Sequence, residues 1–75
     1  MPKLPQLSGS EIVKVLEKMG FHQARQRGSH LVMKKLMPHG SVGCVVPMHR
    51  EVATGTLHGL LKHAQVSAED FLEHI

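Results

Sequence analysis

One histidine set among cationic side chains is the first candidate for chemistry in this sequence. It lies in the segment Arg27-Gly28-Ser29-His30, whose two central residues suit the turn of a β-hairpin. Glycine at the first central position favours the type II′ turn, which matches the twist of the flanking strands. A turn of this length places Arg27 directly across from His30. Because side chains alternate between the two faces of a strand, we expect four of them on one face, where they could hold a phosphodiester: Arg25, Arg27, His30 and Lys34.

Counting outward from the same turn predicts the rest of the hairpin. The count pairs Ala24 with Met33 and Gln23 with Lys34. Ala24, Leu31 and Met33 then share the face opposite the cations. We expect this opposite face to be buried, so a charged residue at position 33 should unfold the domain.

The seven histidines of the chain do not have the spacing of metal ligands. No two of them are four residues apart on an expected helix, and none forms a ligand set with Cys44. A serine hydrolase is also disfavoured, because the side chains of the adjacent Ser29 and His30 should diverge. We therefore expect neither a metal ion nor another cofactor.

RNA cleavage needs fewer protein groups, because the substrate carries its own nucleophile. The 2′-hydroxyl attacks the neighbouring phosphorus once a base removes its proton and cations stabilise the developing charge. Histidine titrates near neutral pH and suits the role of base, so His30 is the candidate. A histidine at the start of a strand can equally be a solvated edge residue, and the spacing alone leaves both interpretations open.

The length of 75 residues allows one domain, residues 1–75, with a small core. A chain of this size buries only about 60% of the surface that its unfolded form exposes. The single cysteine, Cys44, cannot form an internal disulfide, which fits a reducing compartment. No apolar run is long enough for a membrane span or a signal peptide. We expect a soluble, cytoplasmic protein without a membrane partner.

The net charge of +3 is unevenly distributed along the chain. Residues 1–35 contain seven Lys or Arg and two Glu, whereas residues 36–75 contain two Lys or Arg and four acidic residues. The basic first half favours nucleic acid as a partner, although ordinary solvated charge gives the same balance. Because Phe21 and Phe71 are the only aromatic residues, we expect contacts to phosphates, 2′-hydroxyls and RNA shape rather than base stacking.

Helix caps and periodicity predict the elements that must position this hairpin. Ser8 and Glu11 form a capping box before an apolar helical stripe that ends at Gly20. The ring of Phe21 should lie under this helix, because strict alternation would otherwise place it among the cations. The hairpin strands are expected at roughly residues 21–27 and 30–36, with the first beginning after Phe21, and a third strand is expected at residues 42–46.

Two further helices are expected after the strands. Residues 54–64 carry an apolar stripe at helical spacing, and a second capping box, from Ser67 to Asp70, begins a short last helix. The third strand is apolar on both faces, so it could be the middle of the buried region or pack under another element. The order α-β-β-β-α(-α) predicts an α+β fold, a three-stranded antiparallel sheet with helices packed on one face. This is the layout of a double-stranded-RNA-binding domain (dsRBD).

Five short motifs span nearly the whole chain, from Leu7 to Phe71. They are Gly20-Phe21, Gly28-Ser29-His30, Val46-Pro47-Met48-His49, Gly55-Thr56-Leu57 and Val66-Ser67-Ala68-Glu69-Asp70-Phe71. Together they resemble the HicA toxins of bacterial and archaeal toxin–antitoxin pairs. The resemblance implies a dsRBD-like fold and a metal-independent mRNA interferase, an endoribonuclease that inhibits translation by cleaving mRNA. It also implies a HicB-type antitoxin partner that covers the RNA-binding and active-site surface.

The resemblance maps the catalytic histidine of the Gly-Ser-His motif onto His30. The expected RNA-binding residues are Arg25, Arg27, Gly28, Ser29 and Lys34. His49 matches a Pro-x-His motif of the family and is either a secondary site residue or a structural residue at the end of the third strand. Family members often carry an aromatic residue three positions after the histidine, where this chain has Met33, and we expect this difference to change packing rather than activity.

Two other functions could use the same surface. A non-catalytic double-stranded-RNA-binding module would recognise RNA shape through the basic hairpin face and leave the RNA intact. A protein-interaction domain would use that face only for a protein partner and would not bind RNA.

Overall fold

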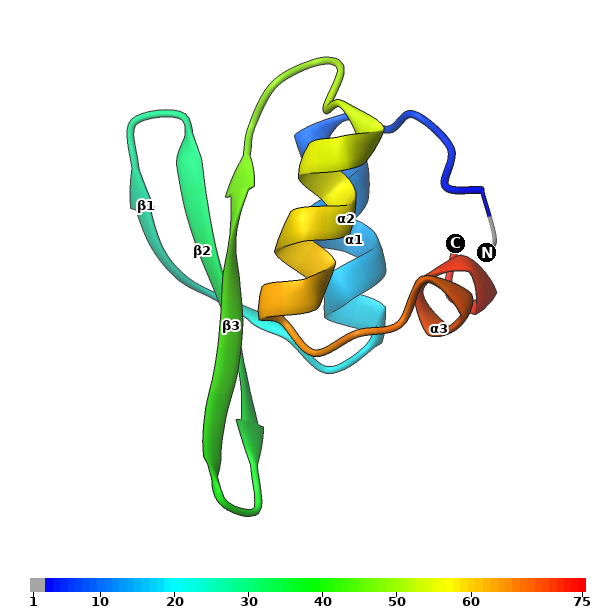
Figure 1. Cartoon of the computed structure of the whole chain (residues 1–75). Helices are drawn as coiled ribbons and strands as arrows, with labels where there is room; N and C mark the ends of the chain where they lie inside the picture. Colours follow the sequence, from blue (N-terminus) through cyan, green and yellow to red (C-terminus); the bar gives the residue numbers. More distant parts are fainter. Residues whose placement is uncertain (1–2) are drawn as a thin grey trace.

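Helices cover one face of a three-stranded antiparallel sheet and leave the other face open (Figure 1). The computed structural model describes residues 3–75. Its elements are α1 (Gly9–Lys18), β1 (His22–Arg27), β2 (His30–Met37), β3 (Gly40–Pro47), α2 (Thr54–His63) and α3 (Ala68–Glu73). The α+β fold predicted from the sequence is confirmed.

Local sequence explains where α1 begins and ends. The hydroxyl of Ser8 accepts a hydrogen bond of 3.1 Å from the amide of Glu11, and the carboxylate of Glu11 accepts one of 2.9 Å from the amide of Ser8. These bonds satisfy amides that have no partner within the helix. Gly20, with φ +97°, then takes the left-handed conformation that stops the helix. The predicted capping box and glycine stop are both confirmed.

The other two helices begin differently from α1. α2 has Ala53 at its N-cap and no side-chain hydrogen bond there. In α3, the hydroxyl of Ser67 accepts a hydrogen bond of 3.1 Å from the amide of Asp70, which is only half of the predicted capping box. An aspartate is one methylene shorter than the glutamate of α1, so its carboxylate reaches back less readily.

The strand order is β1-β2-β3, which makes β2 the central strand. β3 is an edge strand, and Val45 on it is 48% exposed. The interpretation that the third strand is the middle of the buried region is therefore wrong. β3 is also longer than predicted, because a turn at Pro38 and His39 pairs Met37 directly with Gly40. At this end the β2–β3 hairpin extends past the helices (Figure 1).

The core lies between the sheet and the helices. The sheet contributes four buried side chains: Leu31, Met33, Cys44 and Val46. The three helices contribute the completely buried Ile12, Leu16, Leu57 and Phe71. Met33 is itself completely buried, as its position in the alternating pattern predicts. Burial raises the pKa of the Cys44 thiol to about 11, so this cysteine packs in the core and is not a thiolate at neutral pH.

Candidate functional site

The turn that precedes His30 has the predicted geometry. Gly28 has φ +59°, and among residues 3–75 Gln65 is the only non-glycine with a positive φ. Ser29 therefore has a negative φ, which distinguishes a type II′ turn from a type I′ turn. The ladder pairs Arg27 with His30, as expected. His30 is thus an exposed side chain at the end of the central strand, with a cation across from it.

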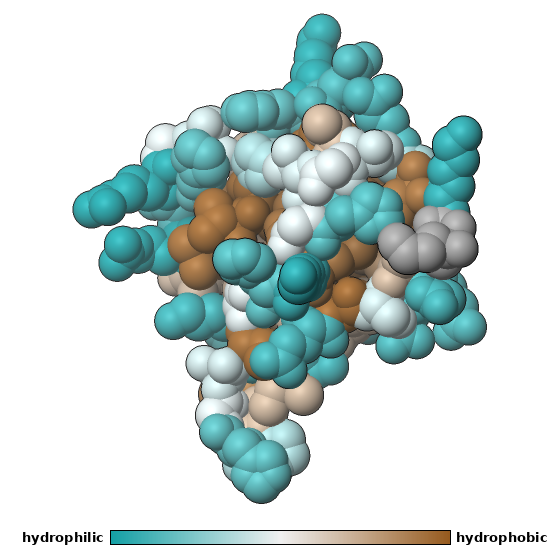
Figure 2. Space-filling view, in the orientation of Figure 1, coloured by the Kyte–Doolittle hydropathy of each residue, from teal (hydrophilic) through white to brown (hydrophobic). Residues whose placement is uncertain are grey.

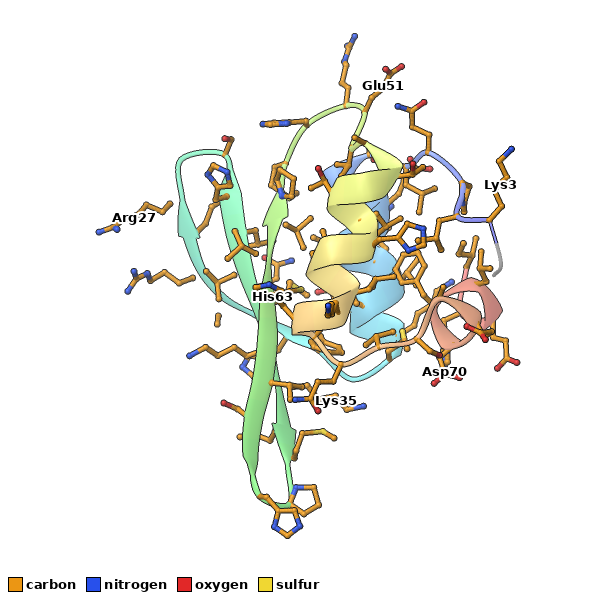
Figure 3. All side chains as sticks on the ribbon, viewed as in Figure 1. Lys3, Arg27, Lys35, Glu51, His63 and Asp70 are labelled. Carbon is orange, nitrogen blue, oxygen red and sulfur yellow. The ribbon has the colours of Figure 1, made fainter. Side chains whose placement is uncertain are left out.

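The cationic face, which we define by Arg25, Arg27, His30 and Lys34, forms as predicted. All four side chains are exposed. Pairing of Arg25 with Val32 and of Arg27 with His30 places both arginines on the face that also carries Lys34, two positions after Val32. Figure 3 shows Arg27 pointing away from the helices. A hollow of about 360 Å³ on this face is lined by Ala24, Arg25, Val32 and Lys34.

A bulge in β1 overturns the predicted pairing of Ala24. The register shifts between Gln23 and Arg25, so that Gln23 rather than Ala24 lies opposite Met33. Ala24 has no partner in the ladder, is exposed, and lines the hollow on the cationic face instead of the core. A bulge of this kind inserts one unpaired residue and bends its strand.

The bulge also reverses the faces of the residues that precede it. The residue opposite Lys34 is His22, whereas the prediction placed Gln23 there. His22 therefore lies on the cationic side of the sheet, a placement that the sequence prediction missed. Phe21 is 4% exposed, and the ammonium of Lys35 lies 5.8 Å from the centroid of its ring. The sequence contained an indication of this bulge. Strict alternation from the turn would place the apolar Phe21 on the cationic face, so one extra residue was required to bury it.

His30 also lines a groove, here called the histidine groove. It has a volume of about 510 Å³ and lies between the end of β3 and the first turn of α2. Its lining residues come from β2, β3, the loop that follows β3, and α2: His30, Val45, Pro47, His49, Glu51, Val52, Ala53 and Thr56. His30 pairs with Pro47 across β2 and β3. The structure therefore brings His30 and His49 into one cavity.

Two backbone hydrogen bonds hold the loop that carries His49. The amide of Met48 donates a bond of 2.6 Å to the carbonyl of Ser29, which extends the β2–β3 contact one residue past His30. The amide of Gly9 in α1 donates a bond of 2.9 Å to the carbonyl of His49. Both the sheet and α1 therefore fix the position of His49.

The histidine groove continues along α2. A second hollow of about 280 Å³ is lined by Val45, Thr56, Gly59, Leu60 and His63, and it shares Val45 and Thr56 with the groove. Figure 3 shows His63 on the side of α2 that faces β3. Hydrophobic atoms are exposed in this region, surrounded by hydrophilic side chains (Figure 2). A ligand in the groove would meet an apolar wall with imidazole groups beside it.

Proton transfer and phosphate binding are the chemistry that these side chains offer. Within residues 3–75, no group of three or more His, Cys, Asp or Glu is arranged to hold a metal ion. In the same part of the chain, no helix is long and apolar enough to cross a membrane.

Comparison with protein families decides the class of this protein. A family model described as "HicA toxin of bacterial toxin-antitoxin" matches residues 9–66. The chain belongs to the HicA toxin family. The matched region begins at the first residue of α1 and ends beyond α2, so it includes the cationic face and the histidine groove. No curated protein and no solved structure matches the chain.

Met33 stands three residues after the histidine of the Gly-Ser-His motif, at the position where the resemblance to HicA toxins predicts an aromatic residue. Met33 lies between Gln23 and Cys44 in the sheet and is completely buried. His30 is on the opposite face, because it is an odd number of positions away along β2. The methionine therefore belongs to the core and does not contact the cationic face.

Proposed function

We propose that this HicA toxin is a metal-independent endoribonuclease that cleaves mRNA and thereby inhibits translation in the cytoplasm, with His30 as the catalytic base. The observation that carries the proposal is the position of His30. It is an exposed imidazole at the edge of the histidine groove, with Arg27 across from it and Arg25 and Lys34 on the same face. These surroundings support a catalytic role for His30 over that of a solvated residue at the end of a strand.

The proposed reaction uses only groups of the substrate and the protein. The imidazole of His30 takes the proton of a ribose 2′-hydroxyl, and the 2′-oxygen forms a bond to the adjacent phosphorus. The bond between phosphorus and the 5′-oxygen of the next nucleotide breaks. Once the departing 5′-oxygen has taken up a proton, the products are a 2′,3′-cyclic phosphate and a 5′-hydroxyl, and neither water nor a metal-bound nucleophile attacks the phosphorus in this step.

The remaining residues of the cationic face bind and stabilise the phosphate. Negative charge develops on the phosphoryl oxygens in the transition state, and fixed cations that face those oxygens lower its free energy. Arg25, Arg27 and Lys34 supply this charge. Gly28 and Ser29 form the turn between the strands, where the absence of a bulky side chain lets an RNA backbone approach closely.

A HicB-type antitoxin is the proposed protein partner. A nuclease of cellular mRNA must be held inactive in the cell that makes it. Covering the cationic face and the histidine groove would block both phosphate binding and proton transfer, so we place the antitoxin contact there.

The proposal is tested with purified protein, end-labelled mRNA and excess EDTA. Wild type should cleave the RNA, and His30→Ala should be slower by about 10²–10⁴-fold, the usual contribution of a general base. His39→Ala is the matched control, because His39 is also exposed but lies in the β2–β3 turn at the far end of the hairpin. Circular dichroism should show that all three proteins are folded.

Two results would replace the proposal with the alternatives that use the same face. RNA binding without cleavage would identify a double-stranded-RNA-binding module. Absence of both binding and cleavage would favour a protein-interaction domain.

A further inference from the structure

An alkoxide is a poor leaving group unless it gains a proton as it departs. When the bond to the 5′-oxygen breaks, this oxygen must gain a proton, and a positioned general acid accelerates that step. Histidine is the side chain that gives and takes protons near neutral pH. The histidine groove contains two histidines, His30 and His49.

We infer that His49 is the general acid that protonates the 5′-oxygen of the leaving nucleotide. The inference rests on the proposed endoribonuclease function and deepens it. His30 takes the 2′-hydroxyl proton as the new oxygen–phosphorus bond forms. His49, as imidazolium, gives its proton to the 5′-oxygen as the old bond breaks. The two imidazoles end the step with exchanged protonation states, and no other reactant is required.

The ladder explains why the two imidazoles can face one phosphate. His30 pairs with Pro47, and His49 is two positions further along the same chain. The Met48 amide donates a hydrogen bond of 2.6 Å to the Ser29 carbonyl. This bond holds the residue after Pro47 beside the residue that precedes β2. β3 ends at Pro47, so His49 reaches the groove from the loop that follows this strand. The volume of the groove, about 510 Å³, leaves room for a phosphoryl group beside the two imidazoles.

Charged neighbours of the pair come from several elements. Arg27 of β1 lies across from His30. Glu51, in the loop between β3 and α2, lines the same groove as His49. His63 of α2 lines the adjoining hollow rather than the groove itself. Arginine stays protonated and a carboxylate accepts rather than donates near neutral pH, so neither Arg27 nor Glu51 replaces His49 as acid.

A change of leaving group tests the role of His49 directly. The probe is an oligoribonucleotide in which sulfur replaces the 5′-bridging oxygen at the position that wild type cuts. A thiol has a pKa of about 8.5, so a thiolate leaves without a proton. The variants are His49→Ala and His49→Gln, with His30→Ala and His39→Ala as comparisons, all checked for folding by circular dichroism.

The expected pattern separates acid from base. On ordinary RNA, both His49 variants should lose about 10²–10⁴-fold in kcat, and on the sulfur substrate they should regain most of that loss. His30→Ala should be slow on both substrates. His39→Ala should match wild type on both.

Other outcomes overturn the inference in distinguishable ways. Equal loss on both substrates would make His49 a structural or RNA-binding residue, and an unchanged rate would exclude it from the reaction. Rescue of His30→Ala instead of the His49 variants would exchange the two roles. If wild type cleaves neither substrate, the nuclease function itself fails and the inference fails with it.

Discussion

The backbone amide of Gly9, the first residue of α1, donates a hydrogen bond of 2.9 Å to the carbonyl oxygen of His49. The two chain segments approach so closely that a Cβ at position 9 would meet the carbonyl oxygen of Pro47 and lie 2.7 Å from the Cα of Met48. Only glycine fits there without a shift of backbone atoms. The start of α1 therefore positions the loop that carries His49.

Gly9→Ala should reduce both stability and RNA cleavage. Alanine is normally better than glycine in a helix by about 1 kcal/mol. At position 9 the overlap of the alanine Cβ with residues 47–48 should make alanine the less stable choice and lower the free energy of unfolding by about 1–3 kcal/mol. Urea unfolding and a cleavage assay measure the two effects. Gly55→Ala is the control, because nothing lies within 4 Å of a Cβ at position 55. A Gly9→Ala protein as stable and active as wild type would show that the loop tolerates displacement.

Arg25→Ala should weaken RNA binding in a salt-dependent way. Each phosphate contact releases counterions, so removing one should reduce the slope of log K against log salt by about 0.7 for single-stranded RNA. Binding is measured in the His30→Ala background to prevent cleavage. Lys62→Ala is the control, since Lys62 is exposed on α2 outside the histidine groove. Equal slopes for both variants would argue against a phosphate contact at Arg25.

Met33→Asp should unfold the domain. Met33 is completely buried, and an aspartate there would be a buried charge without a partner. Met33→Leu keeps the volume nearly constant and should cost less than about 1.5 kcal/mol. Circular dichroism and thermal unfolding distinguish the two. A folded Met33→Asp protein would contradict the inward orientation of this side chain.

Protonation of Glu11 should weaken the start of α1. Hydrogen bonds from the Ser8 backbone amide and the Ser8 side chain hold the pKa of this carboxyl below its ordinary value of 4.5. A group whose pKa is lowered by folding adds stability above its unfolded pKa, and this contribution is lost as pH falls through the folded pKa. The Glu11→Gln variant has a neutral amide at this position, which does not titrate. The difference in free energy of unfolding between wild type and Glu11→Gln should therefore shrink as the pH falls below 4.5.

Urea unfolding of both proteins at a series of pH values makes this measurement. The other carboxyl groups are present in both proteins, so their titration cancels in the difference. A difference that stays constant from neutral to acidic pH would show that the Glu11 charge does not stabilise the helix.

Local signals were sufficient for most of the fold. Ser8 and Glu11 specify the beginning of α1 through bonds between residues three apart. Gly28 specifies the turn, because positive φ is easy for glycine. Met33 and Leu31 are buried as alternation from that turn predicts. Each of these features depends on neighbouring residues, which a sequence displays directly.

Features that depend on distant contacts were missed. The burial of Phe21 was predicted, but the bulge at Ala24 that reconciles this burial with the pairing of β1 and β2 was not. The histidine groove depends on the contact of Gly9 with His49, which are 40 positions apart in the chain. Motif matching singled out His49, but only the folded chain places it in the same cavity as His30.

Analysis of the RNA termini after cleavage in EDTA tests the central claim most directly. The account predicts that wild type yields 2′,3′-cyclic phosphate and 5′-hydroxyl ends and that folded His30→Ala yields almost none. Products with 5′-phosphate ends, or equal cleavage by His30→Ala, would contradict a 2′-hydroxyl attack that depends on His30.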